Sequence, residues 1–252
     1  MTERWFWIEC WFEHDDVFSP SMLNLSKIQA ITLDLDDTLW PVWPTIARAE
    51  VVLQDWLSVH APRTAQLCSD ADVKKRIRLE VNQRHADKAH DLSFLRRESI
   101  RECLIRAGDA PHLADEAFEV FFVERQNVTL YDGVESALER LATRYPLVGL
   151  SNGNADVFRT AAGPYFKASV SARLFGVAKP DARIFHAAAA QLNLTADVVL
   201  HVGDDATTDV LGAMNAGMQT AWVNTQNHEW PHDAAQPLTV NHLAELCDHL
   251  LP

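Results

Sequence analysis

Ile31-Thr32-Leu33-Asp34-Leu35-Asp36-Asp37-Thr38-Leu39-Trp40 is the stretch around which the rest of the chain is organised. An apolar run leads into it from Ile28, and three carboxylates then follow within four positions. A buried parallel strand has this pattern when its carboxyl end opens into a site. Side chains alternate along a strand, so we expect Asp34 and Asp36 to point to the same side, where their charges repel unless a cation offsets them. A hard divalent ion such as Mg²⁺ prefers such oxygen ligands. A polar turn after a strand is the alternative for an isolated Asp-x-Asp.

Three later segments also place polar residues directly after an apolar run or before a helix. They are Leu147-Val148-Gly149-Leu150-Ser151-Asn152, Val177-Ala178-Lys179-Pro180-Asp181 and Val198-Val199-Leu200-His201-Val202-Gly203-Asp204-Asp205-Ala206-Thr207-Thr208-Asp209. Pro180 suits the first turn of a helix that begins there.

In this order and at these separations, the four segments resemble the motifs of the haloacid dehalogenase superfamily, most of whose members are Mg²⁺-dependent phosphohydrolases. The resemblance covers the chain from about Ser26 to the C-terminus. It implies an α/β fold: a Rossmann-like, doubly wound parallel sheet with an inserted α-helical cap. The alternation of expected strands and helices after residue 128 independently predicts a parallel sheet covered on both faces.

The expected division of the chain follows from its periodicity. Residues 44–127 have helical spacing of apolar residues and are the expected cap, while residues 21–43 and 128–252 form the expected catalytic core. The four helices expected in the cap are Thr45 to His60, Asp70 to Lys88, Ser93 to Ala107 and Pro111 to Gln126.

The resemblance also implies a catalytic role for each polar residue. Asp34 is the nucleophile that attacks phosphorus, and Asp36 protonates the leaving alcohol and then deprotonates water. Ser151 and the amide of Asn152 bind phosphoryl oxygens, and Lys179 offsets charge on the nucleophile and the phosphate.

The same resemblance implies a Mg²⁺ site. Asp34, the backbone carbonyl of Asp36 and Asp204 are the expected ligands, and Asp205 or Asp209 is expected to orient the water molecules of the ion.

Three other activities are alternatives to phosphate hydrolysis. The dehalogenases of the family lack the second Asp, so Asp36 favours phosphate chemistry. A phosphomutase uses the same pair of aspartates and stays open. Gly149-Leu150-Ser151-Asn152-Gly153 also matches the G-x-S-x-G turn of serine hydrolases, with Ser151 as nucleophile. That reading leaves the Asp pair, Lys179 and Asp204 unexplained.

Composition limits the partners that we expect. The chain has 252 residues, 48% hydrophobic and 23% charged, which is ordinary globular composition. No apolar run approaches the ~20 residues of a membrane span, and a formal charge of −13 argues against nucleic acid. The four scattered cysteines indicate reduced thiols in a cytoplasmic protein. We expect a small phosphorylated metabolite as partner, and a monomer or weak homodimer.

The expected cap contains an unusual concentration of basic residues. Between Lys74 and Arg106 lie ten basic and five acidic side chains, a net charge of +5. Such a patch could steer an anionic substrate, although solvated helix faces explain most of these charges. Arg96 and Arg97 are the candidates for substrate specificity.

Within the family, the motif segments look closest to bacterial flavin mononucleotide phosphatases, a subgroup that also acts on the phosphoribitylaminouracil intermediate of riboflavin synthesis. We expect one of these two compounds as the substrate. The cap region, where specificity resides, resembles that subgroup less clearly.

Residues 1–20 form an N-terminal extension of uncertain status. Six aromatic or apolar residues crowd into eight positions, without the basic start and cleavage site of a secretory signal. The segment either packs on the domain or a partner, or is not part of the natural protein. Our hypothesis is a translation start at Met22.

Overall fold

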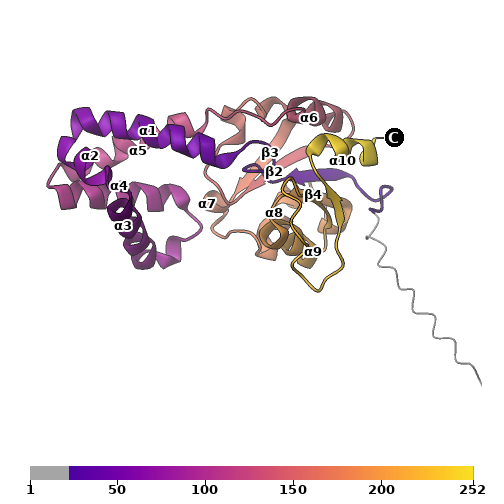
Figure 1. Ribbon diagram of the computed structural model, residues 1–252. Coiled ribbons are helices and arrows are strands. Elements are labelled where there is room, and N and C mark those ends of the chain that lie inside the picture. The colour runs from indigo at the N-terminus through magenta and orange to yellow at the C-terminus, as the bar shows by residue number, and fades with distance from the viewer. Residues whose placement is uncertain (1–22, 252) are drawn as a thin grey trace, which may run out of the picture.

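Six parallel strands form one sheet in the order β3-β2-β1-β4-β5-β6 (Figure 1). The computed structural model describes residues 23–251, so the N-terminal extension and Met22 lie outside the described residues. The strands are β1 (Ala30–Leu33), β2 (Leu147–Ser151), β3 (Phe166–Ser171), β4 (Val199–Gly203), β5 (Gln219–Val223) and β6 (Leu238–Val240). The chain runs outward from β1 in both directions, which confirms the α/β, Rossmann-like prediction.

Helices cover both faces of the sheet. On one face lie α6 (Val134–Ala142) and α10 (Leu243–Leu250), and on the other α8 (Ala182–Ala190) and α9 (Gly212–Asn215) (Figure 1). Strand β1 serves both layers, because Ile31 belongs to the first apolar core and Ala30 to the second. Burial on both faces explains why the strands read as continuous apolar runs. A short helix, α7 (Ala172–Phe175), follows β3, and a π-helical turn (Ala206–Leu211) precedes α9.

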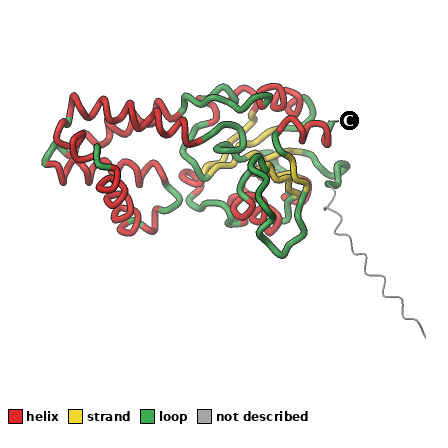
Figure 2. The backbone as a smooth tube through the Cα atoms, viewed as in Figure 1, coloured by secondary structure: helices red, strands yellow, loops and turns green. Residues whose placement is uncertain are grey.

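The segment from Val42 to Arg125, called the helical region below, lies to one side of the sheet (Figures 1 and 2). It contains α1 (Val42–His60), α2 (Pro62–Cys68), α3 (Ala71–Arg84), α4 (Leu92–Ala107) and α5 (Ala114–Arg125). It has an apolar core of its own, to which α1, α2, α4 and α5 contribute. The first helix begins shortly after β1, so the carboxyl ends of the parallel strands face this region.

Local sequence signals explain where these helices begin and end. Asp70 accepts hydrogen bonds from the amides of Asp72 (2.9 Å) and Val73 (3.1 Å) and so caps α3. Gly108 ends α4 in the left-handed conformation, with φ +76°. Helix α2 was not predicted; it begins at Pro62, a residue that suits the first turn of a helix. In the part of the chain that the structure describes, no helix is long and apolar enough to cross a membrane.

Candidate active site

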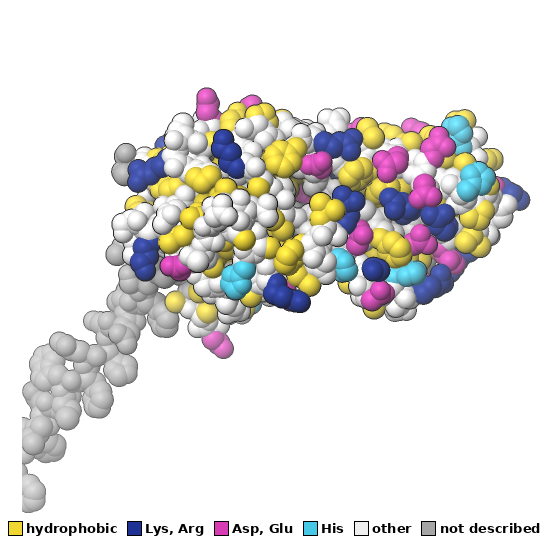
Figure 3. All heavy atoms as spheres, turned by 180° about the vertical axis from the view of Figure 1, so that it is seen from behind, with side chains coloured by type: hydrophobic (Ala, Val, Ile, Leu, Met, Phe, Trp, Pro, Cys, Tyr) yellow, Lys and Arg dark blue, Asp and Glu magenta, His cyan; other side chains and the backbone are white. Residues whose placement is uncertain are grey.

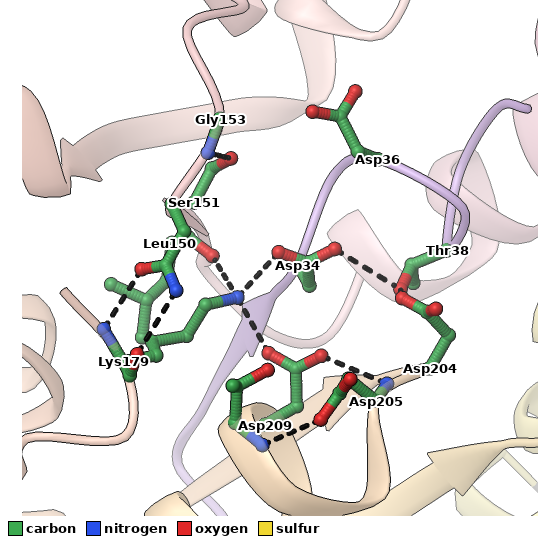
Figure 4. A network of polar contacts seen from close by, with 12 residues as sticks. Asp34, Asp36, Thr38, Leu150, Ser151, Gly153, Lys179, Asp204, Asp205 and Asp209 are labelled. Carbon is green, nitrogen blue, oxygen red and sulfur yellow. Dashed lines mark hydrogen bonds and ion pairs between the residues drawn. The ribbon is translucent and has the colours of Figure 1, made fainter. Parts of the chain in front are cut away.

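The four polar segments meet at the carboxyl ends of adjacent strands (Figure 4). Asp34 follows β1, Ser151 ends β2, and Asp204 follows β4. Strand β1 lies between β2 and β4, at the point where the strand order reverses. Open parallel sheets form their binding crevices at this point.

Lys179 is the buried cation of this site. Its ammonium donates a hydrogen bond to the Asp34 carboxylate, to Asp209 Oδ1 at 2.5 Å and to the Leu150 carbonyl at 2.9 Å. The side chain of Asn152 fixes the Lys179 backbone, with its Nδ2 donating to the carbonyl (3.0 Å) and its Oδ1 accepting from the amide (2.8 Å). Burial lowers the pKa of Lys179, but the charges of Asp209 and Asp34 outweigh it and hold that pKa above its ordinary value. Lys179 is therefore a permanent positive charge.

Asp34, Asp204 and Asp209 form a carboxylate cluster, in which each offers an oxygen within 4.8 Å of the others. The Thr38 hydroxyl lies 3.0 Å from Asp204 Oδ1 and 3.4 Å from Asp34 Oδ2, so it bridges two of the three acids. Burial and the charges of Asp209 and Asp204 outweigh the ammonium of Lys179 and raise the pKa of Asp34 well above its ordinary value. Burial and the charge of Asp209 likewise raise the pKa of Asp204 to about 7.

Asp209 behaves differently from the other two acids. Burial opposes its charge, but the ammonium of Lys179 and a hydrogen bond from His201 outweigh burial and hold the pKa of Asp209 below its ordinary value. Its Oδ2 also accepts the Asp205 amide at 3.1 Å. The single ammonium of Lys179 pairs with both Asp209 and Asp34, so the three carboxylates together carry more negative charge than this one cation offsets.

This cluster fits a divalent metal ion. Its donors are hard carboxylate oxygens, and its excess negative charge is the condition that a cation relieves. The two acids expected to orient water differ in position. Asp209 lies in the cluster, whereas the Asp205 carboxylate accepts the amides of Thr207 (2.9 Å) and Thr208 (2.6 Å) and caps the turn that follows β4.

Asp36 lies apart from the carboxylate cluster, and its side chain points away from it (Figure 4). Our expectation that Asp34 and Asp36 point to the same side was wrong, because β1 ends at Leu33 and alternation stops there. The chain turns instead at Asp37, whose φ is +59° and whose carboxylate accepts the Val42 amide at 2.9 Å.

The Asp36 carboxylate lies close to the segment that follows β2, at Gly153. A Cβ atom on Gly153 would lie 2.3 Å from Asp36 Oδ2 and 3.1 Å from Ser151 Oγ. Ser151 Oγ accepts the Gly153 amide at 2.9 Å. The absent side chain therefore allows the Asp36 carboxylate to lie against Gly153, close to Ser151.

Three residues that contact the predicted site residues were not predicted as part of the site: Trp40, Arg125 and His201. Arg125, at the end of the helical region, donates to the Asp36 carboxylate, as does Trp40 Nε1 at 2.7 Å. His201 is buried in β4, 2.8 Å from Thr32 Oγ1 and 3.3 Å from Asp209 Oδ1.

The two arginines predicted to read the substrate occupy different environments. Arg96 lines a pocket of about 180 Å³ between the helical region and the core, together with Phe121 and Asn154. Its guanidinium pairs with Glu50 and lies 4.0 Å from the centre of the Phe121 ring. Arg97 does not line this pocket; it pairs with Asp115 at 3.1 Å.

Comparison with known proteins identifies the family. Residues 28–217 match the model of the haloacid dehalogenase-like hydrolases. Over 230 residues the chain is 32% identical to the 5-amino-6-(5-phospho-D-ribitylamino)uracil phosphatase of Escherichia coli (strain K12), covering 88% of this chain and 96% of that enzyme. The chain belongs to the haloacid dehalogenase-like hydrolases.

Two further proteins are similar to this chain, one over a segment and the other over most of its length. A 96-residue segment is 42% identical to a pyrimidine 5'-nucleotidase of the same organism, covering 36% of this chain and 43% of that enzyme. The crystal structure of a 2-haloacid dehalogenase from Pseudomonas syringae pv. Tomato DC3000 superposes with a TM-score of 0.83 at 35% identity, covering 88% of this chain and 98% of that one. The family assignment that the motif segments predicted is confirmed.

Proposed function

We propose that this enzyme is a Mg²⁺-dependent phosphomonoester hydrolase that acts through a phosphoryl group carried by Asp34. The observation that carries the proposal is the position of Asp36. It is a second carboxylate, separate from the cluster around Lys179, and it lies against Gly153 and Ser151. An aspartate nucleophile with a nearby proton carrier is the equipment that phosphate ester cleavage needs.

In the first step, a carboxylate oxygen of Asp34 attacks phosphorus, and the bond from phosphorus to the ester oxygen breaks. Asp36 gives its proton to that departing oxygen, so the alcohol leaves neutral. Ser151 and the amide of Asn152 would hold phosphoryl oxygens. The Lys179 charge, 2.5 Å from Asp209 and in contact with Asp34, balances the negative charge that gathers there.

In the second step, water attacks the phosphorus of the aspartyl-phosphate, and Asp36, now ionised, takes its proton. Asp34 returns as a carboxylate and inorganic phosphate leaves. Asp36 is protonated again at the end, so the cycle balances.

Mg²⁺ would be held by Asp34, the Asp36 carbonyl and Asp204, with Asp209 beside it; when bound, it offsets the charge of these acids and of the phosphate. Thr38 fixes the relative positions of Asp34 and Asp204 through its two hydrogen bonds. These residues thus keep the nucleophile oriented towards phosphorus.

Asp36 also separates this proposal from dehalogenation, the activity named for the structural relative from Pseudomonas syringae. A halide leaves without a proton, so a dehalogenase has no use for a proton carrier beside the nucleophile. The serine hydrolase alternative lacks support, because among the described residues no histidine is hydrogen-bonded to Ser151, whose hydroxyl accepts the Gly153 amide.

For the substrate, we propose 5-amino-6-(5-phospho-D-ribitylamino)uracil, the compound that the name of the Escherichia coli phosphatase gives as its substrate. Flavin mononucleotide is the second candidate. Both join a phosphate to a planar heterocycle through a flexible polyol. The pocket between the helical region and the core has an aromatic wall at Phe121 and hydrogen-bonding groups at Arg96 and Asn154, which suits a planar heterocycle. In this proposal the helical region is a cap that selects the leaving group.

A substrate panel tests the proposal. Purified enzyme with Mg²⁺ is given both candidates, a pyrimidine nucleotide, p-nitrophenyl phosphate and a sugar phosphate, and released phosphate and isomeric products are measured. The proposal predicts phosphate release that EDTA abolishes, with the highest kcat/KM on a candidate. Full activity in EDTA would contradict the metal assignment, and conversion of the sugar phosphate to an isomer would favour the mutase alternative.

A cytoplasmic location is part of the proposal. Cys68, Cys103 and Cys247 are free thiols, as expected in a reducing compartment.

A further inference from the structure

Arg125 joins the helical region to the proton carrier of the core. It is the last residue of α5, and its Nη2 lies 2.5 Å from Asp36 Oδ1 and 2.7 Å from Asp36 Oδ2. Its side chain is only 1% exposed. A residue 89 positions away in the chain therefore fixes both oxygens of Asp36.

The Asp36 carboxylate is held from three directions. Arg125 contacts both oxygens, Trp40 Nε1 donates to Oδ1 at 2.7 Å, and Oδ2 lies against Gly153 where a Cβ would otherwise be. Together these contacts leave the carboxylate little freedom to rotate, and they direct it to the Ser151 side of the site.

The Arg125 guanidinium makes few hydrogen bonds for a buried group. Among the described residues, Nε and Nη1 of Arg125 have no hydrogen-bond partner although both are buried. Buried donors without partners cost stability, and native proteins contain few of them. Within the described residues, the hydrogen bonds of the Arg125 side chain therefore go to Asp36 alone.

We propose that Arg125 is a positioning residue, which holds Asp36 where the ester oxygen leaves and makes that placement depend on contact between the helical region and the core. Arg125 moves with α5, so the carboxylate is correctly placed only when the helical region is docked. Arg125 keeps its own proton throughout and acts through Asp36. This inference rests on the proposed function, in which Asp36 transfers the protons.

A double-mutant cycle tests whether Arg125 acts through Asp36. Arg125→Gln, Asp36→Asn and the double variant are assayed with p-nitrophenyl phosphate, a good leaving group, and with glycerol phosphate, a poor one. On glycerol phosphate we expect Arg125→Gln alone to lower kcat by about 10- to 100-fold with little change in KM, a part of the 10²–10⁴-fold that a proton carrier provides. With p-nitrophenyl phosphate the loss is smaller. In the Asp36→Asn background, the same change has an effect below about 3-fold, because the group it positions is gone.

Two further variants control for stability. Arg48→Gln removes a guanidinium that pairs with Glu124 and with the Asn127 carbonyl at the same end of α5, without contacting Asp36. It is expected to affect both substrates equally. Arg125→Lys keeps a positive charge, and we expect it to retain more kcat on glycerol phosphate than Arg125→Gln. If Arg125→Gln fails to fold, Arg125→Lys replaces it in the same double-mutant cycle.

The outcomes are distinguishable. If Arg125 variants lose the same factor with and without Asp36, or the same factor on both substrates, the positioning role is overturned and Arg125 is a structural contact. If Asp36→Asn itself shows no preference for the good leaving group, the role of Asp36 in the proposed function fails instead.

Discussion

Two acidic sites of this molecule, each at least partly buried, have opposite charge environments. At the carboxyl ends of the strands, Asp34, Asp204 and Asp209 share one cation, Lys179. In the helical region, Glu50 alone receives three cations, and these four residues are the Glu50 cluster: Glu50, Lys74, Arg78 and Arg96.

The pKa values follow this difference. Burial and neighbouring acids raise the pKa of Asp204 to about 7, whereas at Glu50 the charges of Arg96 and Arg78 outweigh burial and lower the pKa to about 2. An excess of carboxylates calls for a cation from outside the chain, and an excess of guanidinium groups offers donors to a polar ligand. In the proposed function, the sheet edge carries out the chemistry and the helical region recognises the substrate. Acidic and basic side chains are interspersed over the surface of the helical region (Figure 3).

The largest expected effects come from the sheet edge and apply to every substrate. Asp34→Asn removes the nucleophile and should abolish turnover of both p-nitrophenyl phosphate and the physiological substrate. Asp36→Asn leaves the nucleophile in place and should cost about 10²–10⁴-fold, more on poor leaving groups. Steady-state kinetics with a series of aryl and alkyl phosphates measures this. Identical behaviour of the two variants across the series would contradict the division of roles.

Metal and pH provide a second test of the carboxylate cluster. Asp204 has a folded pKa raised from 3.8 to about 7, so the folded state binds more protons than the unfolded state between these values. Without metal, this acid therefore makes the protein less stable as the pH rises from about 4 to 7. The pKa of Asp209 is lowered, so its effect on stability appears only below its unfolded value of 3.8. The pKa of Lys179 is raised, so its effect on stability appears only above its unfolded value of 10.5.

Mg²⁺ binding should remove that penalty. We expect the rise in melting temperature on adding Mg²⁺ to be larger at pH 8 than at pH 5.5, and Asp204→Asn to reduce both the rise and its pH dependence. Thermal melts with EDTA or Mg²⁺ at the two pH values measure it. An equal rise at both pH values in wild type and variant would show that Asp204 is not a ligand.

A smaller, substrate-selective effect is expected from the Glu50 cluster. Arg96→Ala should lower kcat/KM for 5-amino-6-(5-phospho-D-ribitylamino)uracil by about 10- to 150-fold, the worth of one charge-assisted contact, and affect p-nitrophenyl phosphate little. Arg97→Ala is the matched control, because Arg97 pairs with Asp115 and does not line the pocket. An equal loss on both substrates would place Arg96 at the phosphate. No loss on either substrate would show that Arg96 does not contact the substrate.

The smallest effect concerns stability alone. The lowered pKa of Glu50 stabilises the fold above its unfolded value of 4.5, and this stabilisation is lost as the pH falls towards 2. Glu50→Gln should therefore reduce the free energy of unfolding by about 1–3 kcal/mol at pH 7 and by less at pH 4. Urea titrations of both proteins at the two pH values give the comparison. A difference that does not shrink at pH 4 would mean that charge is not its origin.

The sequence predicted which polar residues meet at the sheet edge, because these residues obey local rules. Asp34, Ser151 and Asp204 each follow a buried strand, and parallel strands bring their carboxyl ends to one edge. Lys179 was predicted because its segment comes directly before an expected helix. Such patterns depend on a few neighbouring residues, so a single sequence reveals them.

Contacts between distant segments could not be predicted in this way. The pairing of Arg125 with Asp36 depends on how α5 meets the core, and nothing near residue 125 marks it. The direction of Asp36 was wrong because the strand ends at Leu33, one residue before the acidic stretch begins. The separation of Arg96 from Arg97 depends on the packing of α4 against its neighbours, which helical periodicity alone leaves open.

In the proposed mechanism, Asp34 carries the phosphoryl group while Asp36 moves protons. Asp36→Asn enzyme with Mg²⁺ is mixed with p-nitrophenyl phosphate, and p-nitrophenol release and the mass of the protein are followed on the millisecond to second scale. The account predicts a burst of about one p-nitrophenol per enzyme and a phosphoryl group on the peptide that contains Asp34. Asp34→Asn should give neither. A burst without protein phosphorylation, or a phosphoryl group on Ser151, would contradict the account.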